Sequence, residues 1–223
     1  MKTEDGYLAV PASGSGPGVL VLHAWWGMNE FFIELCDRLA SEGFVALAPD
    51  LYAGAVATSV AEAEKLRDAN DVAASVTQSK VLQALDSLKN LQHDPATQGH
   101  RVGVMGCSLG AFWALRLSTL CPEDIAATVI FYGLGAEDFT PSRAAYLGHF
   151  AENDLWEPLD QVRAMEADIR SAGKDVTFHV YPGAGHWFFE ENREDAFHAE
   201  YAQLAWDRTV SFLRDRLAKY SGD

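Results

Sequence analysis

The sequence has few cysteines, and their placement disfavours two kinds of site. Cys36, Cys107 and Cys121 are the only cysteines among 223 residues. Their odd number and the lack of a paired, metal-type spacing disfavour a disulfide framework and a zinc site. We therefore expect a chain that works in a reducing compartment, the cytoplasm, without a bound metal ion.

Basic residues are also scarce. The 17 lysines and arginines stand against 32 aspartates and glutamates, which gives a formal net charge of −15. Such a surface repels nucleic acid phosphates and anionic membranes, so we expect neither as a partner. No basic segment followed by an apolar core opens the sequence. No apolar run approaches the roughly 18 residues that a membrane-spanning helix needs, and we expect a protein that is neither exported nor membrane-bound.

The sequence contains no internal repeat and no low-complexity tract. Its length and its 48% content of hydrophobic residues suit one globular domain with a full core. We expect residues 1–223 to form a single domain with short flexible termini, at about residues 1–5 and 220–223.

Short apolar runs alternate with segments of helical periodicity along the whole sequence. Strands are predicted at residues 7–10, as a short edge strand, and at 19–23, 44–48, 102–105, 126–132, 145–150 and 176–181. Helices are predicted at 29–41, in two pieces between 59 and 91 with a break around 70–71, at 108–120 and at 158–172, and residues 194–220 are predicted to form one long or broken helix. This alternation favours an α/β fold with a mostly parallel sheet covered by helices on both faces. Only about a dozen residues, 133–143, separate two of the strands, which is too few for a large lid domain.

The motif G-x-S-x-G lies between a predicted strand and a predicted helix. It reads Gly106-Cys107-Ser108-Leu109-Gly110. In this context the serine occupies a strained strand-to-helix turn, its hydroxyl group is exposed, and side chains in place of the flanking glycines would clash. We predict that Ser108 is a nucleophile, and that Cys107, at the variable position, points into the fold. The alternative is a solvated serine in a glycine-rich turn.

A serine nucleophile in such a sheet needs its base and its acid at the ends of later strands. His186 follows the last predicted strand in a glycine-rich loop, and Asp154 follows the strand before it. The order Ser108, Asp154, His186 is the nucleophile, acid and base order of this architecture. His186 would remove the serine proton and Asp154 would orient the imidazole. Glu152 and Asp138 are alternatives to Asp154.

Two backbone N–H groups are predicted to hold a developing oxyanion. One belongs to Leu109, which follows the nucleophile at the start of a helix, and the other to Trp25, in the loop after the strand at 19–23. His23 and Asp50 are expected to be structural residues.

The substrate pocket is expected to be shallow and aromatic. Trp26, Trp156 and Trp187 lie close in sequence to the proposed site positions, and large rigid side chains at strand ends line ligand sites well. The alternative is that these tryptophans belong to the core. Arg143 and Arg193 are candidates to bring positive charge to the pocket.

Five short segments carry a family resemblance. They are His23-Ala24-Trp25-Trp26-Gly27-Met28-Asn29, Ala48-Pro49-Asp50-Leu51-Tyr52, the motif at 106–110, Glu152-Asn153-Asp154, and Tyr181-Pro182-Gly183-Ala184-Gly185-His186. Together they resemble the dienelactone hydrolase family of α/β-hydrolases, in family order, from about residue 5 to 217. The resemblance implies a single-domain hydrolase of esters or lactones that needs no cofactor, with its catalytic triad at Ser108, His186 and Asp154.

The sequence departs from the family pattern at two coupled positions. Characteristic members have a cysteine where this chain has Ser108. They also have a glutamate, which helps to activate the thiol, where this chain has Ala24. We expect Ala24 to lie at the pocket. The arginines that hold a substrate carboxylate in dienelactone hydrolases have no clear counterpart, and Glu190 stands four residues after His186. We therefore predict an acyl-Ser108 intermediate and a preference for neutral over anionic acyl groups.

Other functions remain open on the same fold. An acyl-enzyme can also serve an acyltransferase or a peptidase, and a hydrolase fold can carry a binding protein that catalyses nothing. The expected partner is a small ester or lactone, and the sequence leaves both a monomer and a small homo-oligomer open.

Overall fold

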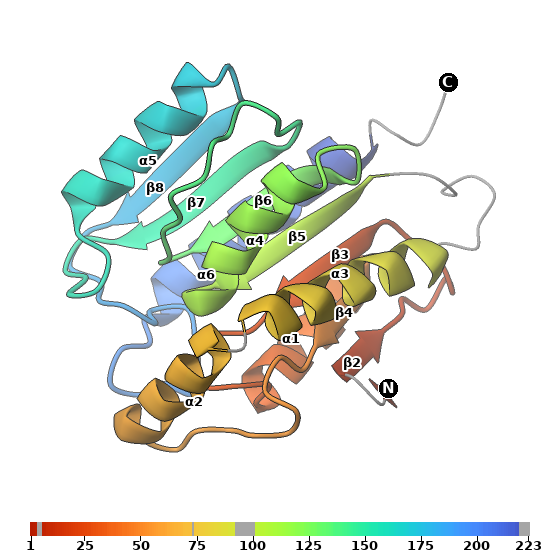
Figure 1. The fold of residues 1–223 in the computed structure, drawn as a ribbon, viewed down its shortest axis with the longest axis horizontal. Coiled ribbons are helices and arrows are strands. Elements are labelled where there is room, and N and C mark those ends of the chain that lie inside the picture. Colours follow the sequence, from red (N-terminus) through yellow and green to blue (C-terminus); the bar gives the residue numbers. More distant parts are fainter. Residues whose placement is uncertain (4–5, 73, 92–100, 219–223) are drawn as a thin grey trace.

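The computed structural model describes residues 1–3, 6–72, 74–91 and 101–218. These residues form one sheet with helices packed on both faces (Figure 1). The strands are β1 (Lys2–Thr3), β2 (Gly6–Ala9), β3 (Gly18–Leu22), β4 (Val45–Pro49), β5 (Val102–Cys107), β6 (Ile125–Phe131), β7 (Ala145–Ala151) and β8 (Val176–Tyr181). The helices are α1 (Glu30–Ser41), α2 (Val60–Val72), α3 (Ala74–Leu91), α4 (Leu109–Leu120), α5 (Leu159–Ser171) and α6 (Ala199–Ala218).

The sheet is mostly parallel, as predicted. Its strand order is β1-β2-β4-β3-β5-β6-β7-β8, and every pair from β4 to β8 in this order is parallel. Only β1 and β2 run antiparallel to their neighbours. Parallel strands need crossover connections, which the helices supply. The loops that follow β3, β5, β7 and β8 therefore meet at one edge of the sheet, where ligands bind in open α/β folds.

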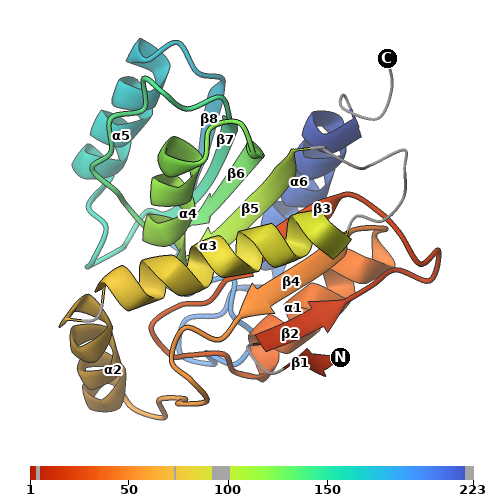
Figure 2. The ribbon, with the colours of Figure 1, turned by 45° about the vertical axis from the view of Figure 1, so that its right-hand side comes forward.

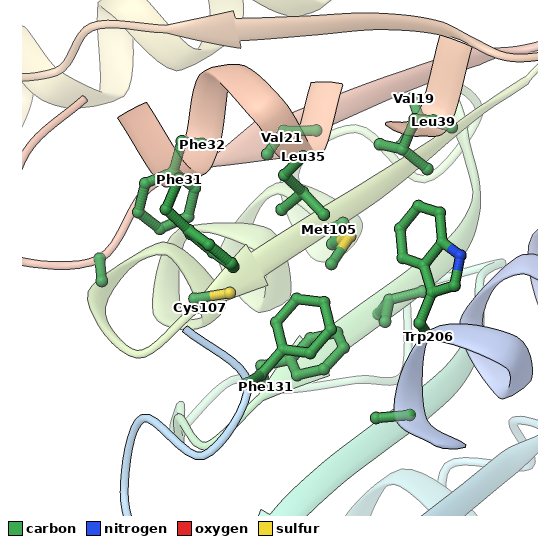
Figure 3. Close-up of a cluster of buried hydrophobic side chains, with 14 of the residues drawn as sticks. Val19, Val21, Phe31, Phe32, Leu35, Leu39, Met105, Cys107, Phe131 and Trp206 are labelled. Atoms are coloured by element: carbon green, nitrogen blue, oxygen red, sulfur yellow. The ribbon is translucent and has the colours of Figure 1, made fainter. Parts of the chain in front are cut away.

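Strand β3 shows how both faces of the sheet are covered. Its Val19 and Val21 join a buried cluster with α1 and α6, whereas Leu20 and Leu22 join a second cluster with α3, α4 and α5. Figure 2 shows the two helical layers on either side of the sheet. In Figure 3 Val21 lies beside Leu35 of α1 and Val19 beside Leu39, and Trp206 of α6 belongs to the same cluster. A strand buried on both faces needs apolar residues at every position, which explains its unbroken apolar run.

The N-terminal end of the sheet extends beyond the prediction. Residues 7–10 were expected to form an edge strand, but β1 pairs outside β2, with Lys2 opposite Tyr7. The terminal amino group of Met1 also donates a hydrogen bond to the carbonyl oxygen of Leu8. Residues 1–3, expected to be part of a flexible terminus, thus extend the sheet. A strand of two residues has no periodicity to detect. Residues 4–5 and 219–223 lie outside the described residues.

Two helix predictions differ in their boundaries. The segment between 59 and 91 forms two helices, as predicted, although α2 continues to Val72 past the expected break at 70–71. The last helix begins at Ala199 and not at residue 194. Residues 194–196 form a turn and residues 197–198 are irregular, because the N–H of His198 donates to the carbonyl oxygen of Phe188 and not to the preceding turn. This tertiary hydrogen bond outweighs local helix propensity.

The connection from β6 to β7, residues 132–144, contains no helix or strand, and all of it is described. No lid is inserted there, in agreement with the prediction. Within the described ranges, no helix combines the length and the apolar composition needed to span a membrane.

Candidate active site

Ser108 occupies a strained turn between β5 and α4. Its φ and ψ angles are 51° and −114°, a conformation that non-glycine residues seldom adopt. The flanking glycines allow the turn: a Cβ atom at Gly106 would lie 2.1 Å from the carbonyl oxygen of Gly110, and one at Gly110 would lie 2.0 Å from that of Leu22. The N–H of Ser108 is fixed by a 2.9 Å hydrogen bond to the carbonyl oxygen of Phe131. The motif therefore forms the turn that the sequence predicts.

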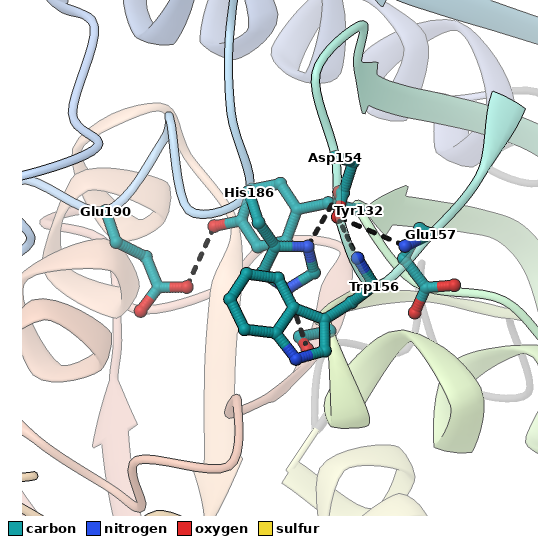
Figure 4. Close-up of polar contacts among 7 residues, drawn as sticks. Tyr132, Asp154, Trp156, Glu157, His186 and Glu190 are labelled. Atoms are coloured by element: carbon teal, nitrogen blue, oxygen red, sulfur yellow. Dashed lines mark hydrogen bonds and ion pairs between the residues drawn. The ribbon is translucent and has the colours of Figure 1, made fainter. Parts of the chain in front are cut away.

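The structure brings the three predicted polar residues together. Figure 4 shows His186 next to Asp154. Nε2 of His186 lies 3.1 Å from Oγ of Ser108, and Nδ1 lies 2.7 Å from Oδ2 of Asp154. The other oxygen of Asp154 accepts hydrogen bonds from the N–H groups of Trp156 and Glu157, at 2.9 and 3.1 Å. With its Nδ1–H directed at Asp154, the neutral imidazole presents Nε2 as an acceptor for the serine hydroxyl group.

The two alternative acids have other partners. Glu152 accepts the N–H of Gly183 through Oε2, at 2.9 Å. Asp138 is exposed, and its hydrogen bonds with Thr140 lower the pKa of its carboxyl group. The carboxylate that faces the imidazole is therefore that of Asp154.

A cavity of about 190 Å³ opens beside Ser108. It is lined by Trp25, Arg67, Ser108, Leu109, Phe112, Leu134, Trp156, Glu157, His186 and Trp187. Trp25, Trp156 and Trp187 pack against one another, and we call these three side chains the tryptophan wall. Trp25 and Trp187 are 6% and 5% exposed, whereas Trp156 is 49% exposed. The lining of this cavity is thus largely aromatic, and Trp25 and Trp187 are also part of the core.

Both predicted oxyanion donors border this cavity. Leu109 is the first residue of α4, where backbone N–H groups have no partner inside the helix. Trp25 lies in the loop after β3 and lines the same cavity. Both residues therefore border the space next to Ser108 in which a substrate carbonyl group would lie.

Four residues expected at the pocket lie elsewhere. Ala24 is completely buried in the core, and Trp26 lies behind the tryptophan wall, with its ring 5.5 Å from that of Trp187. Arg143 precedes β7, so it lies at the opposite edge of the sheet, 2.6 Å from a carboxylate oxygen of Glu123. Arg193 does not line the cavity either.

Arg193 supports the tryptophan wall from behind. Its guanidinium carbon lies 4.2 Å from the ring centres of both Trp26 and Trp187, and Nη2 lies 2.8 Å from Asp195. Cation–π contacts of this kind hold aromatic rings in place. Arg193 thus shapes the pocket without contributing charge to its lining.

Two charged residues of the lining, Arg67 and Glu157, were not predicted. Arg67 comes from α2, with its guanidinium carbon 5.8 Å from the Trp25 ring centre and Nη2 2.7 Å from Asp68. Burial and the neighbouring Asp154 raise the pKa of Glu157 to about 8. The only signal for Glu157 was its place in the loop of Asp154, and nothing local marked Arg67.

A buried polar cluster lies behind His186. The ring of Tyr132 is 4.8 Å from that of His186, and its hydroxyl group donates a 2.9 Å hydrogen bond to Glu190. Burial raises the pKa of Glu190 to about 7. Cys107 is also completely buried, and this burial together with the charge of Glu190 raises the pKa of its thiol well above the usual range. Cys107 thus points into the fold, as predicted.

His23 and Asp50 have the structural roles that were expected. Nδ1 of His23 lies 2.7 Å from the carbonyl oxygen of Ala24, and Nε2 accepts the N–H of Leu51 at 3.1 Å. This pairing fits a neutral imidazole, and burial lowers the pKa of His23. Asp50 accepts the N–H of Tyr52 at 2.9 Å and so fixes the loop after β4.

The arrangement suits proton transfer from a serine hydroxyl group. A hydroxyl group, an imidazole and a carboxylate stand in hydrogen-bonded sequence beside a small cavity. This is the geometry of an activated serine nucleophile. Among the described residues, no group of three or more histidine, cysteine, aspartate or glutamate side chains is placed to hold a metal ion.

Comparison with known proteins places the chain in a family. The profile of the dienelactone hydrolase family matches residues 5–217. The chain is 35% identical over 219 residues to "Protein usf" of Aquifex pyrophilus, with 95% of this chain and 93% of that protein covered. It is 33% identical over 221 residues to "Putative carboxymethylenebutenolidase" of Aquifex aeolicus (strain VF5), with the same coverage.

Solved structures agree with this assignment. The crystal structure titled "Putative Dienelactone Hydrolase" from Klebsiella pneumoniae subsp. pneumoniae MGH 78578 has a TM-score of 0.79 and 27% identity, with 93% of this chain and 91% of that chain covered. A thermophilic esterase of Thermogutta terrifontis shares the fold, with a TM-score of 0.67 at 16% identity, and the match covers 94% and 86% of the two chains. The family profile matches nearly the whole sequence, and the mostly parallel sheet and the strained turn at Ser108 are consistent with it. The chain therefore belongs to the dienelactone hydrolase family of α/β-hydrolases.

Proposed function

We propose that this hydrolase cleaves small carboxylic esters or lactones through an acyl-Ser108 intermediate. The observation that carries the proposal is the hydrogen-bonded line from Asp154 through His186 to Oγ of Ser108, with steps of 2.7 and 3.1 Å, at the edge of the cavity. The name carboxymethylenebutenolidase, borne by the relative from Aquifex aeolicus, supports a lactone as one substrate class.

Acylation begins when Oγ of Ser108 attacks the carbonyl carbon of the substrate. Nε2 of His186 takes the hydroxyl proton as the new C–O bond forms, and Asp154 stabilises the resulting imidazolium. The negative charge on the former carbonyl oxygen is stabilised by the N–H groups of Leu109 and Trp25. Each such donor typically contributes about 3 kcal/mol to lowering the barrier.

The tetrahedral intermediate then loses its alcohol. The bond from the carbonyl carbon to the alcohol oxygen breaks, and the imidazolium of His186 gives its proton to that oxygen. In a lactone the alcohol stays attached to the acyl chain. Water next attacks the acyl-enzyme with His186 as the base, and the same steps release the acid and restore Ser108.

The cavity limits the size of the substrate. Its volume of about 190 Å³ is below the 300–1,000 Å³ that is usual for sites of drug-sized ligands. The tryptophan wall and Phe112 make much of its surface apolar. We therefore propose short or compact acyl groups as the preferred substrates.

A fluorophosphonate probe tests the nucleophile directly. We expect a single covalent adduct, located by mass spectrometry on Ser108, and no adduct on the Ser108→Ala protein. A panel of p-nitrophenyl esters and lactones of increasing size should show turnover that falls as the acyl group outgrows the cavity. Absence of both the adduct and turnover would overturn the proposal in favour of a binding protein. Faster release of the acyl group to alcohols or amines than to water would replace hydrolysis by acyl transfer.

A further inference from the structure

Glu157 puts a carboxyl group into the wall of the cavity that holds Ser108. It follows Asp154 in the loop between β7 and α5 and lines the cavity together with Leu134 and Phe112. In Figure 4 its side chain lies beside Asp154, on the side away from Glu190. Because the cavity has a volume of only about 190 Å³, a substrate that fills it lies next to Glu157.

The groups around Glu157 leave the cavity with negative charge. Asp154 lies in the same loop and is hydrogen-bonded to His186. Arg67 is the cation among the described lining residues, and its guanidinium is paired with the carboxylate of Asp68 at 2.7 Å. Burial and Asp154 hold the pKa of Glu157 at about 8, against the opposing effect of a hydrogen bond from the backbone of Leu134. The net charge of the lining therefore becomes more negative as the pH rises through this value.

The remaining surface of the cavity is aromatic. The ring centres of the tryptophan wall are 4.8 to 6.3 Å apart, and Phe112 adds a further ring to the lining. Trp156 is half exposed, so its ring is accessible to a ligand. The faces of such rings attract cations, and aromatic cages are a common way to bind quaternary ammonium groups.

We propose that Glu157 and the tryptophan wall make this cavity selective for esters that carry a positive charge, such as an alkylammonium group, over neutral esters of the same shape. The proposal rests on the acyl-Ser108 mechanism above and adds the class of substrate. The net charge of −15 acts in the same direction, because it steers cations toward the protein.

A pair of esters with equal shape and different charge tests the proposal. We would compare kcat/KM for a short-chain choline ester and for the 3,3-dimethylbutyl ester of the same acid, from pH 6.5 to pH 9.5. The charge of the choline group does not change with pH. The ratio of kcat/KM for the choline ester to kcat/KM for the neutral ester cancels the pH dependence of the triad. We expect a ratio above one that increases on the order of tenfold as Glu157 ionises.

Two variants distinguish the effect of the Glu157 charge from the effect of the overall negative charge of the protein. Glu157→Gln keeps an oxygen for the N–H of Leu134 and removes the charge, so the ratio should no longer change with pH. Asp160→Asn removes the same charge from an exposed position in the first turn of α5, outside the cavity, and should keep the wild-type ratio.

The outcomes distinguish this proposal from the mechanism on which it rests. If the neutral ester is hydrolysed through Ser108 but the wild-type ratio is the same at pH 6.5 and pH 9.5, selection by Glu157 is refuted and the mechanism stands. A ratio that still rises with pH in Glu157→Gln refutes it as well. If no ester is hydrolysed and the fluorophosphonate probe leaves Ser108 unlabelled, both proposals fail.

Discussion

The hydroxyl group of Tyr132 donates a 2.9 Å hydrogen bond to Oε1 of Glu190, and both side chains are completely buried directly behind His186. Among the residues that the structure describes, none is hydrogen-bonded to the second carboxylate oxygen of Glu190. A carboxyl group in such a place is stable when protonated and costly when ionised.

Stability should therefore depend on the ionisation of Glu190. Its pKa is raised by burial to about 7 in the folded protein, against 4.5 for an ordinary glutamate, so the unfolded chain loses this proton at lower pH than the folded one. The stabilisation is complete below pH 4.5 and is lost as the pH rises through about 7. The loss amounts to about 3 kcal/mol. Glu190→Gln has no such titration, and Gln can still accept the hydrogen bond from Tyr132.

Urea unfolding between pH 4 and pH 8 measures this effect. The difference in unfolding free energy, Glu190→Gln minus wild type, should rise with pH by about 3 kcal/mol across that range. A difference that stays constant with pH would show that Glu190 is not the group that titrates.

Loss of either Ser108 or His186 should remove most of the esterase activity. We expect Ser108→Ala and His186→Ala each to lower kcat on the order of 10⁴-fold to 10⁶-fold, and the double variant to be hardly worse, because triad residues act as a unit. Cys107→Ala is the matched control, since this neighbouring side chain is buried away from the cavity. Near-normal turnover in Ser108→Ala together with loss in Cys107→Ala would identify Cys107 as the nucleophile.

The turn at Ser108 should not tolerate a methyl group at Gly110. The added Cβ would lie 2.0 Å from the carbonyl oxygen of Leu22 and 2.8 Å from that of His23, so backbone would have to move. We expect Gly110→Ala to cost at least about 3 kcal/mol of unfolding free energy and to abolish activity. Gly14→Ala is a control with open space around its Cβ. Its positive φ alone should cost only about 1 to 2 kcal/mol. Equal losses in both variants would mean that the close approach to Leu22 is unimportant.

Neutral acyl groups should be preferred over anionic ones, and Arg143 and Arg193 should not change this preference. Arg143 lies at the far edge of the sheet, so Arg143→Ala should leave kcat/KM for both kinds of substrate unaltered. Arg193 supports Trp26 and Trp187, so Arg193→Ala should lower both values by a similar factor. The measurement compares a neutral ester with its carboxylate-bearing analogue. A selective loss for the anionic ester in either variant would show that this arginine binds the substrate carboxylate.

The triad and the sheet could be predicted because both follow from local patterns. Ser108, Asp154 and His186 each come within a few residues after an apolar run, and the ends of parallel strands meet at one edge. The chain order then decides which residues face one another. The same reasoning would have excluded Arg143 from the pocket, because it precedes its strand and must lie at the other edge.

Features that depend on how distant segments pack were not predictable. Arg67 reaches the cavity because α2 lies over the carboxyl edge of the sheet, and the sequence of a helix does not reveal where the helix lies. Glu157 differs from the other acidic residues only in its burial next to Leu134 and Asp154. The start of α6 is set by the hydrogen bond from His198 to Phe188, a contact without a local signal.

The parallel order of the sheet also makes the active site a late product of folding. Ser108 and His186 are 78 positions apart and meet only when β5, β6, β7 and β8 have paired in register. Helices form from local contacts and therefore early, whereas pairings between distant segments are slow because long loops must close first. Recovery of ester hydrolysis after dilution from denaturant would thus lag behind recovery of helical circular dichroism. The rate at which activity recovers would therefore report the rate at which β8 completes the sheet.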